Sequence, residues 1–385
     1  MKHFLWHRFI LAFLRVVAGP FIKRIMKYSC KKQKAPDKPS LIISNHNTDL
    51  DPALVALGFS RHMYFLASEH AFRNGFPSKV MRFIFDPIPF NKTQTDISSI
   101  KEMIRRLKAG ASVCLFAEGD RSFSGTTAPV AISTAKLVKA SRADLITYRL
   151  EGGYFTSPRW SKSFRKGKMT GGIVNKYSAD EIRAMNDEQV LSVIQRDIYE
   201  NAYDRQNENL VRFRGKNLAE NIETALYLCP ECKQSGTIRS TGNNFSCDCG
   251  LRGEYLETGF LQGDSLPFTT IAEWDIWQAE QMKELISASG DGTICSDENQ
   301  QLFEVRAAEG KTLVGEGAML MDRKSFRCAG MTFPMECITR FAIVGQMTLL
   351  FAVKDGPAYE IRSAAPRSAL KYRDVFQFLT EKLNP

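Results

Sequence analysis

Short apolar runs alternate with helical patterns between residues 40 and 177. The runs show little alternation of polar and apolar positions, which is typical of strands that are covered on both faces. Two intervening segments, DPALVAL and DISSIKEMIRRLKAG, space their apolar residues as helices do. The pattern predicts an α/β domain with a central mixed sheet and flanking helices. The expected strands are LIIS (41–44), MYFLA (63–67), SVCLFAE (112–118), LITYRL (145–150) and GGIVNKY (171–177).

The pattern changes beyond this region. Ser178 to Glu181 and Asn186 to Gln189 fit capping boxes, and the second is expected to open a helix that continues to about residue 202. Residues 203–222 are polar and indicate a connector. From about residue 290, short strands follow in series, with a hairpin signal at KDGP (354–357) and a final helix in PRSALKYRDVFQFLTEKL. We expect a β-rich domain with a closing helix, similar to pleckstrin-homology-like domains in its order of elements.

The N-terminal segment combines apolar and basic residues. Residues 1–34 carry nine Lys or Arg and no acid. A transmembrane helix needs roughly 20 consecutive apolar residues, and Arg8 and Arg15 interrupt every stretch of that length here. We predict a basic amphipathic segment at the membrane interface, on the cytoplasmic face, in a peripheral or monotopic protein. The alternative is a helix packed on the protein's own surface. The residues expected to enter the headgroup boundary are Phe4, Leu5, Phe9, Leu11, Phe13, Leu14 and Val17.

Composition narrows the class of protein. With 385 residues, 44% hydrophobic and 24% charged, the chain is globular and long enough for two or three domains. A formal net charge of +10 favours an anionic partner, which leaves lipid headgroups, phosphorylated small molecules and nucleic acid open. Nine cysteines, an odd number, do not indicate a secreted disulfide framework and are typical of a reducing compartment.

Four cysteines cluster in CPEC (229–232) and CDCG (247–250). This spacing predicts a zinc ribbon in which Cys229, Cys232, Cys247 and Cys249 bind a structural Zn²⁺. The alternative, a redox pair, does not account for four cysteines. The predicted domains are a membrane-interface segment at 1–34, an α/β domain at 35–222, the zinc ribbon at 223–260 and the β-rich domain at 261–385.

Two predicted strands run directly into polar motifs. NHNTDLD (45–51) places His46 and Asp51 after the first strand, and FAEGDRS (116–122) places Glu118, Gly119, Arg121 and Ser122 after the third. Strands that end on the same edge of an open sheet bring such residues into one crevice. Gly119 then allows close backbone approach, and Arg121 can grip a phosphate. The alternative is structural, with Asp51 as a helix N-cap and His46 as a satisfied histidine.

These motifs resemble those of the glycerolipid acyltransferases, the lysophosphatidate acyltransferase family. NHNTDLD resembles N-H-x-x-x-x-D, and FAEGDRS resembles F-P-E-G-T-R-S, with Ala117 for proline and Asp120 for threonine. DPIPFNK (86–92) is similar to G-x-I-P-x-x-R, with Lys92 for arginine. The resemblance implies that His46 is the general base and that Asp51 orients it. The residues assigned to substrate binding are Asn45, Lys92, Glu118, Gly119, Arg121 and Ser122.

The expected reaction is that of a 1-acylglycerol-3-phosphate O-acyltransferase. It moves an acyl group from acyl-CoA or acyl-carrier protein to the sn-2 hydroxyl of lysophosphatidate, which gives phosphatidate for phospholipid synthesis. Alternatives are acylation of another lysophospholipid or of glycerol 3-phosphate, a lipid-binding scaffold without activity, and a nucleic-acid-binding zinc-ribbon protein. The last does not explain His46 and Asp51, so no nucleic acid partner is expected. Residues 152–168 interleave Lys and Arg with aromatic residues, and we expect an exposed surface there for donor phosphates or membrane, unless it is a solvated loop.

Overall fold

The computed structural model describes residues 2–31, 38–69, 72, 76–90, 97–306 and 310–381. The chain divides into two compact units. The N-terminal unit comprises Met1–Asn91, Asp96–Pro158 and Phe164–Arg214, and the C-terminal unit comprises Lys92–Thr95, Arg159–Ser163 and Gly215–Pro385. The division into four domains made from the sequence stays a prediction.

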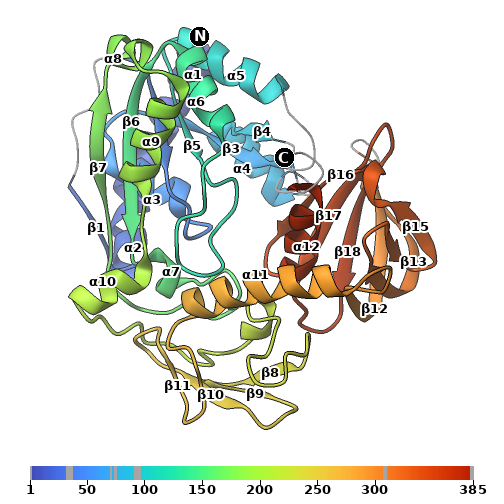
Figure 1. The fold of residues 1–385 in the computed structure, drawn as a ribbon. Helices are drawn as coiled ribbons and strands as arrows, with labels where there is room; N and C mark the ends of the chain where they lie inside the picture. The colour runs from blue at the N-terminus through green and yellow to red at the C-terminus, as the bar shows by residue number, and fades with distance from the viewer. Residues whose placement is uncertain are drawn as a thin grey trace. The chain divides into compact units, whose positions relative to one another are not determined.

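A seven-stranded mixed sheet forms the centre of the N-terminal unit, in the order β1-β7-β6-β2-β5-β3-β4 (Figure 1). β6 and β7 pair antiparallel, and the other neighbouring strands pair parallel. The predicted α/β class and its strands are confirmed. The strands are β1 Tyr28–Cys30, β2 Ser40–Ser44, β3 Met63–Ser68, β4 Ile88–Phe90, β5 Ser112–Phe116, β6 Asp144–Glu151 and β7 Met169–Tyr177.

Helices cover both faces of this sheet, which explains why its strands lack polar alternation. Leu41 and Ile43 of β2 enter a core formed with α5, α6 and α9. Ile42 enters a second core with Leu54 and Val55 of α3. The helices of this unit are α1 Lys2–Val17, α2 Gly19–Ile25, α3 Asp51–Gly58, α4 Phe76–Phe85, α5 Ile97–Lys108, α6 Ile132–Ser141, α7 Gly153–Thr156, α8 Ala179–Ala184, α9 Asp187–Ile198 and α10 Ala202–Glu208.

The two predicted capping boxes are present, and they open α8 and α9. The expectation that the second helix continues to about residue 202 is wrong. α9 ends at Ile198, and a second helix, α10, begins at Ala202 with the Asn201 side chain accepting from the Tyr203 N–H. The break has a local cause, since the Glu200 N–H donates to the Thr127 hydroxyl at 2.9 Å instead of to the helix. Part of the predicted connector at 203–222 is therefore helical.

The C-terminal unit contains two sheets, in the orders β11-β10-β9-β8 and β15-β14-β13-β12-β18-β17-β16 (Figure 1). The hairpin at KDGP joins β17 to β18, and α12 packs on the larger sheet through Phe376, whose ring lies 5.0 Å from that of Phe341. The β-rich region with a closing helix is confirmed, and the likeness to pleckstrin-homology-like domains stays a prediction. α11, which a capping box from Thr270 to Glu273 opens, was not predicted.

The elements of this unit include the following. The strands are β8 Ile238–Thr241, β9 Asn244–Cys247, β10 Arg252–Tyr255, β11 Leu261–Gln262, β12 Cys295–Arg306, β13 Gly310–Met321, β14 Ser325–Cys328, β15 Met331–Pro334, β16 Ile338–Val344, β17 Thr348–Val353 and β18 Ala358–Ser363. The helices are η2 Ile222–Thr224, α11 Ile271–Ala288, η3 Met335–Cys337 and α12 Leu370–Glu381. Within the part of the chain that the structure describes, no helix is both long and apolar enough to cross a bilayer.

Candidate active site

His46 and Asp51 form a hydrogen-bonded pair in the loop between β2 and α3. The two atoms, Nδ1 of His46 and Oδ2 of Asp51, are 2.9 Å apart, and Asp51 is fully buried. The same carboxylate oxygen accepts the backbone N–H groups of Asn47 and Thr48 at 2.6 and 2.8 Å. Leu50, not Asp51, is the N-cap of α3, so the helix-cap interpretation of Asp51 is wrong.

This arrangement determines which nitrogen of His46 is available. Because the carboxylate of Asp51 only accepts, Nδ1 of His46 carries the proton and donates it, which leaves the lone pair on Nε2. The ring stacks on Phe116, the last residue of β5, with centroids 4.4 Å apart and planes 21° apart. The His46 side chain is still 21% exposed. A bound molecule can therefore reach an imidazole whose orientation and tautomer are both fixed.

The second motif lies beside the first because β2 and β5 are parallel neighbours, with Ser44 paired to Phe116. The loop that follows β5 returns to the histidine, where the Ser122 N–H donates to the His46 carbonyl at 3.4 Å. Gly119 adopts a φ of 72°, a backbone conformation that favours glycine, and nothing lies within 4 Å of the position that a Cβ would take there. Both polar motifs thus lie at the same edge of the sheet, as expected.

Arg121 is the cation of this edge. Its Nε lies 3.4 Å from Oδ1 of Asp49, in the loop that carries His46, and its side chain is 11% exposed while that of Asp49 is 83% exposed. The structure thus brings His46, Asp51 and Arg121 together. Lys92, the other predicted cation, lies outside the described residues.

Glu118 makes internal contacts instead of facing outward. Oε1 accepts the His46 N–H at 2.6 Å, and Oε2 accepts the Ala128 N–H at 2.7 Å. Burial raises the pKa of this carboxyl to about 8, although the two backbone N–H groups oppose that shift. Both oxygens are occupied, so we interpret Glu118 as a residue that joins two loops of the site.

Two other predicted substrate-binding residues are also satisfied internally. The Ser122 hydroxyl donates to the Thr126 carbonyl and accepts the Gly125 N–H. The Asn45 side chain exchanges hydrogen bonds with the backbone of Leu150, both at 2.8 Å. Asn45 and Ser122 hold the backbone of the site, because short polar side chains at strand ends satisfy the nearest backbone groups. Their assignment to substrate binding stays a prediction.

Part of the basic aromatic loop is buried, and its tryptophan is not on the exposed surface that we expected. Trp160 is fully buried and packs edge-on against Tyr255, with ring centroids 5.2 Å apart, within the C-terminal unit. Arg159 donates to the carbonyls of Ile343 and Gly345 in the same unit, at 2.8 and 3.0 Å. The expectation of an exposed tryptophan beside cations is therefore wrong, because this segment supplies core contacts.

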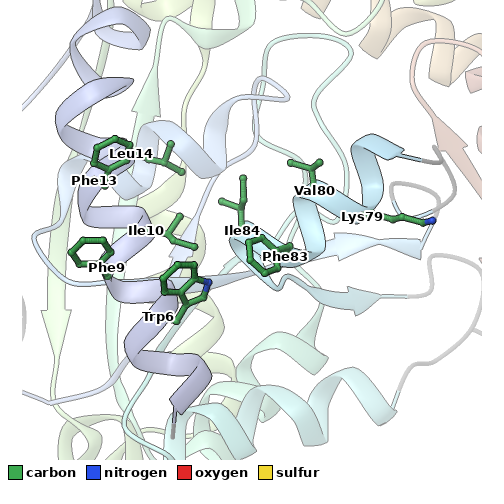
Figure 2. A pocket seen from close by; sticks show the side chains of 9 residues that line it. All are labelled: Trp6, Phe9, Ile10, Phe13, Leu14, Lys79, Val80, Phe83 and Ile84. Carbon is green, nitrogen blue, oxygen red and sulfur yellow. The ribbon is translucent and has the colours of Figure 1, made fainter.

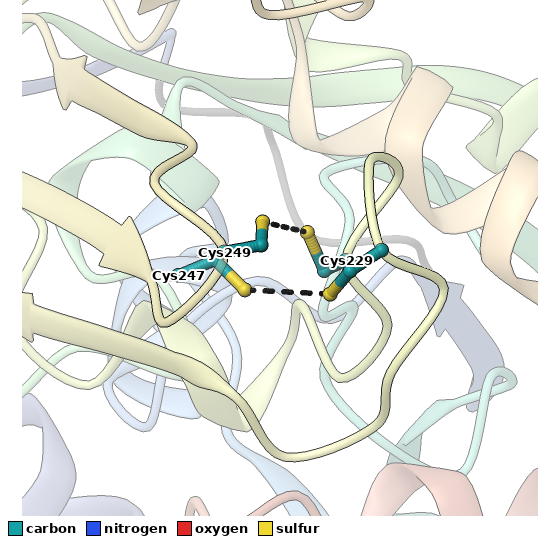
Figure 3. Close-up of side chains that lie close together, drawn as sticks. Cys229, Cys247 and Cys249 are labelled. Carbon is teal, nitrogen blue, oxygen red and sulfur yellow. Dashed lines mark hydrogen bonds between the residues drawn. The ribbon is translucent and has the colours of Figure 1, made fainter.

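The four predicted metal ligands converge in the C-terminal unit (Figure 3). Their sulfur atoms all lie within 4.8 Å of one another, with 3.7 Å from Cys229 to Cys249 and from Cys232 to Cys247. Four thiolates at about 2.3 Å from a tetrahedral zinc ion would lie about 3.8 Å apart. The donor set and the spacing fit a Cys₄ zinc site. A position for water or substrate is not left among four protein ligands, so such a site would be structural.

An apolar groove of about 530 Å³ lies between α1 and α4 (Figure 2). Its aromatic residues are unusually accessible: Phe9, Phe13 and Phe83 are 69%, 59% and 63% exposed. Another side of α1 packs on the protein, since buried His7 contacts the Tyr64 hydroxyl at 3.1 Å. One face of this helix therefore packs on the protein's own surface, and the membrane-interface interpretation of its exposed face stays a prediction. The groove is lined by Trp6, Phe9, Ile10, Phe13, Leu14, Lys79, Val80, Phe83 and Ile84.

One contributor to the site was not predicted. The Glu200 carboxylate accepts a hydrogen bond of 2.8 Å from the side-chain amide of Asn47, the residue that follows His46. No motif marks Glu200, which lies in the break between α9 and α10.

Comparisons with known proteins find matches to part of the chain. The Acyltransferase family model matches residues 26–151, which include His46, Asp51 and Arg121. No curated protein matches the chain. Among solved structures, the chain is similar to the 1-acyl-sn-glycerophosphate (LPA) acyltransferase PlsC from Thermotoga maritima, with 18% identity, a TM-score of 0.38, and coverage of 51% of this chain and 94% of that chain. The chain is thus similar to the acyltransferase family over residues 26–151, the part that carries the motifs at His46 and Arg121.

Proposed function

We propose that this protein transfers an acyl group from acyl-CoA or acyl-carrier protein to the sn-2 hydroxyl of lysophosphatidate. The observation that carries the proposal is the free Nε2 of His46, on a ring fixed by Asp51 and Phe116 within the acyltransferase segment. A fixed imidazole with one available lone pair is suited to accept a proton from an alcohol near neutral pH.

The proposed reaction proceeds in two steps. The acceptor hydroxyl gives its proton to Nε2 of His46 while its oxygen forms a bond to the thioester carbonyl carbon. The tetrahedral intermediate then breaks its carbon–sulfur bond, and the imidazolium returns the proton to the leaving thiolate. Asp51 stabilises the imidazolium through Nδ1 and stays a hydrogen-bond acceptor. No covalent enzyme intermediate is required.

Arg121 is proposed to bind the acceptor phosphate. Asp49, one of its partners, is 83% exposed, so an incoming phosphate can compete with this carboxylate for Nε. Phosphate oxygens are strong hydrogen-bond acceptors for a guanidinium. This contact would hold the acceptor with its free hydroxyl near His46.

The test is a panel of three acceptors, lysophosphatidate, glycerol 3-phosphate and lysophosphatidylcholine, with one acyl-CoA donor. Lysophosphatidate is expected to give the highest kcat/KM. Arg121→Ala should raise the KM for lysophosphatidate about tenfold or more, since hydrogen bonds to charged groups contribute about 1.5–3 kcal/mol, while kcat changes less. The matched control is Arg183→Ala, which removes an exposed guanidinium paired with Asp180.

Three outcomes of the panel count against the proposal. Equal rates with lysophosphatidylcholine would assign the protein to another lysophospholipid. An unchanged acceptor KM in Arg121→Ala would remove the phosphate contact. Salt-sensitive DNA binding with no acyl transfer would favour the nucleic-acid-binding alternative.

The groove between α1 and α4 supports a second part of the proposal, a membrane-bound protein on the cytoplasmic face of the bilayer. Fully burying a phenylalanine side chain contributes about 1.5–3 kcal/mol, or roughly tenfold or more in partitioning. Phe9→Ser with Phe13→Ser is therefore expected to lower binding to vesicles that contain anionic phospholipid by about 100-fold. Sedimentation with vesicles measures this, with Leu313→Ser as the control because Leu313 is a 48% exposed apolar residue of the C-terminal unit. Undiminished sedimentation of the double variant would place the membrane contact elsewhere.

The four cysteines support a further part of the proposal, a structural Zn²⁺. Cys229, Cys232, Cys247 and Cys249 would hold it in the geometry described above. A bound ion would connect two turns of a small module, and such modules bury too little apolar surface to fold well alone.

A further inference from the structure

Glu200 is a buried carboxylate outside the acyltransferase match, in the three-residue break between α9 and α10. It is 4% exposed. The break itself is held in place, because the Thr127 N–H donates to the Glu200 carbonyl at 2.9 Å. The backbone of Glu200 is therefore held in one position, from which its side chain extends into the site.

Its carboxylate contacts both residues that flank the proposed base. Oε2 accepts the side-chain amides of Asn45 and Asn47, at 3.2 and 2.8 Å. Oε1 accepts the Gly152 N–H at 3.0 Å, at the end of β6. His46 lies between the two asparagines, so one carboxylate holds both sides of the residue that carries the imidazole.

The contacts continue through Asn47 to the His46–Asp51 pair. Asn47 donates its side-chain amide to Glu200 and its backbone N–H to the same Asp51 oxygen that accepts from His46. A shift of Asn47 therefore moves the hydrogen-bond partner of the imidazole. Misplacement of a catalytic group by about 1 Å can reduce the rate of the catalysed reaction about 100-fold.

The charged groups around Glu200 come from three elements. The guanidinium of Arg205, in α10, lies 3.6 Å from Oε1 of Glu200. The same guanidinium lies 2.8 Å from the carboxylate of Glu151, in β6. The third charged group is the buried carboxyl of Glu118, which follows β5. Burial is the largest influence and raises the pKa of Glu200 to about 7, while its contacts with Asn47, Gly152 and Arg205 oppose the rise.

We propose that Glu200 is a positioning residue of the acyl-transfer reaction, which holds Asn45 and Asn47 so that Nε2 of His46 faces the acceptor hydroxyl. The proposal rests on the proposed function. Glu200 binds the loop on both sides of His46, and it acts through that loop. It extends the site beyond the segment that the family model matches.

The test is Glu200→Gln, which has the same shape but only one acceptor oxygen. Its amide N–H₂ must face either the Gly152 N–H or the two asparagine amides, so one donor is left opposite another donor. We expect kcat for lysophosphatidate to fall roughly tenfold or more, with the acceptor KM within about twofold of the wild-type value. Glu200→Asp, which keeps both oxygens, should restore part of kcat. Glu208→Gln, at an exposed glutamate of α10, is the control.

A second measurement separates positioning from general stability. The proton of Nδ1 in His46 that is bonded to Asp51 should give a low-field NMR signal in the wild type, and this signal should broaden or shift in Glu200→Gln while the melting temperature stays close to that of the wild type. An unchanged signal with an unchanged kcat would overturn the proposal.

The outcomes distinguish this inference from the proposed function. A wild-type protein inactive with every acceptor removes the proposed function and the Glu200 role with it. An active wild type with an equally active Glu200→Gln removes the Glu200 role alone. If Glu200→Gln does not fold, Asn47→Ala deletes one bond of the same contact, and full kcat in the folded Asn47→Ala variant would overturn the proposal.

Discussion

Replacing His46 by alanine is expected to reduce kcat/KM for acyl transfer to lysophosphatidate at least about 100-fold, the size of a general-base contribution. The fold should survive, because the His46 ring contacts only Asp51 and Phe116 among the described contacts of its side chain and stays partly exposed. Steady-state rates with one acyl-CoA donor measure the loss, and circular dichroism checks the fold. Glu208→Gln serves again as the matched control.

His46→Gln makes this test sharper. Glutamine can still donate a hydrogen bond to Asp51 but has no basic nitrogen, so a general-base role predicts a loss as large as that of alanine. Retained activity in His46→Gln, together with unfolding of His46→Ala, would restore the structural interpretation of the histidine. Normal turnover in both variants would refute the assignment of the base.

The second large effect is expected on metal removal. A chelator, or Cys229→Ala, should unfold the region around the four cysteines, since structural zinc contributes roughly 10–16 kcal/mol in zinc-finger peptides. Metal analysis of the purified wild type should find about one zinc ion per chain, and thermal melting should show a lower midpoint after chelation. Cys337→Ser is the matched control, because Cys337 lies outside the cluster and is only partly buried.

Two results would contradict the zinc site. One is a folded wild-type protein that contains no stoichiometric metal. The other is a pair of disulfides among Cys229, Cys232, Cys247 and Cys249 in the active protein, which would favour the redox alternative. The separation of 3.7 Å between paired sulfurs is longer than the roughly 2.05 Å of a disulfide bond.

The strands and the two motif loops were predictable from local patterns. β2 and β5 are short apolar runs that end at polar motifs, and parallel pairing of neighbouring strands brings their ends to one edge. His46 and Asp51 are five residues apart, so their contact follows from one loop. The convergence of the four cysteines was also predictable, because the spacing of metal ligands along the chain is a local property.

The contacts that the sequence could not show join residues that are far apart in the chain. The contact between Glu200 and Asn45 spans 155 residues, and no periodicity or motif reports such a pairing. Glu118 was recognised as an acid after a strand, but the sequence could not show that two backbone N–H groups occupy both of its oxygens. Trp160 was assigned to the surface because its neighbours are basic, although Tyr255 covers its ring.

The short segment from Arg159 to Ser163 limits how this chain can be divided. It groups with the C-terminal unit although both of its flanks belong to the N-terminal unit. A protein truncated after Arg214 would keep Trp160 but lose Tyr255, so the indole would be left without its aromatic neighbour and would favour aggregation. An exchange of the N-terminal unit between related proteins must therefore keep residues 159–163 with the C-terminal unit. A single crossover between the units would separate Trp160 from Tyr255.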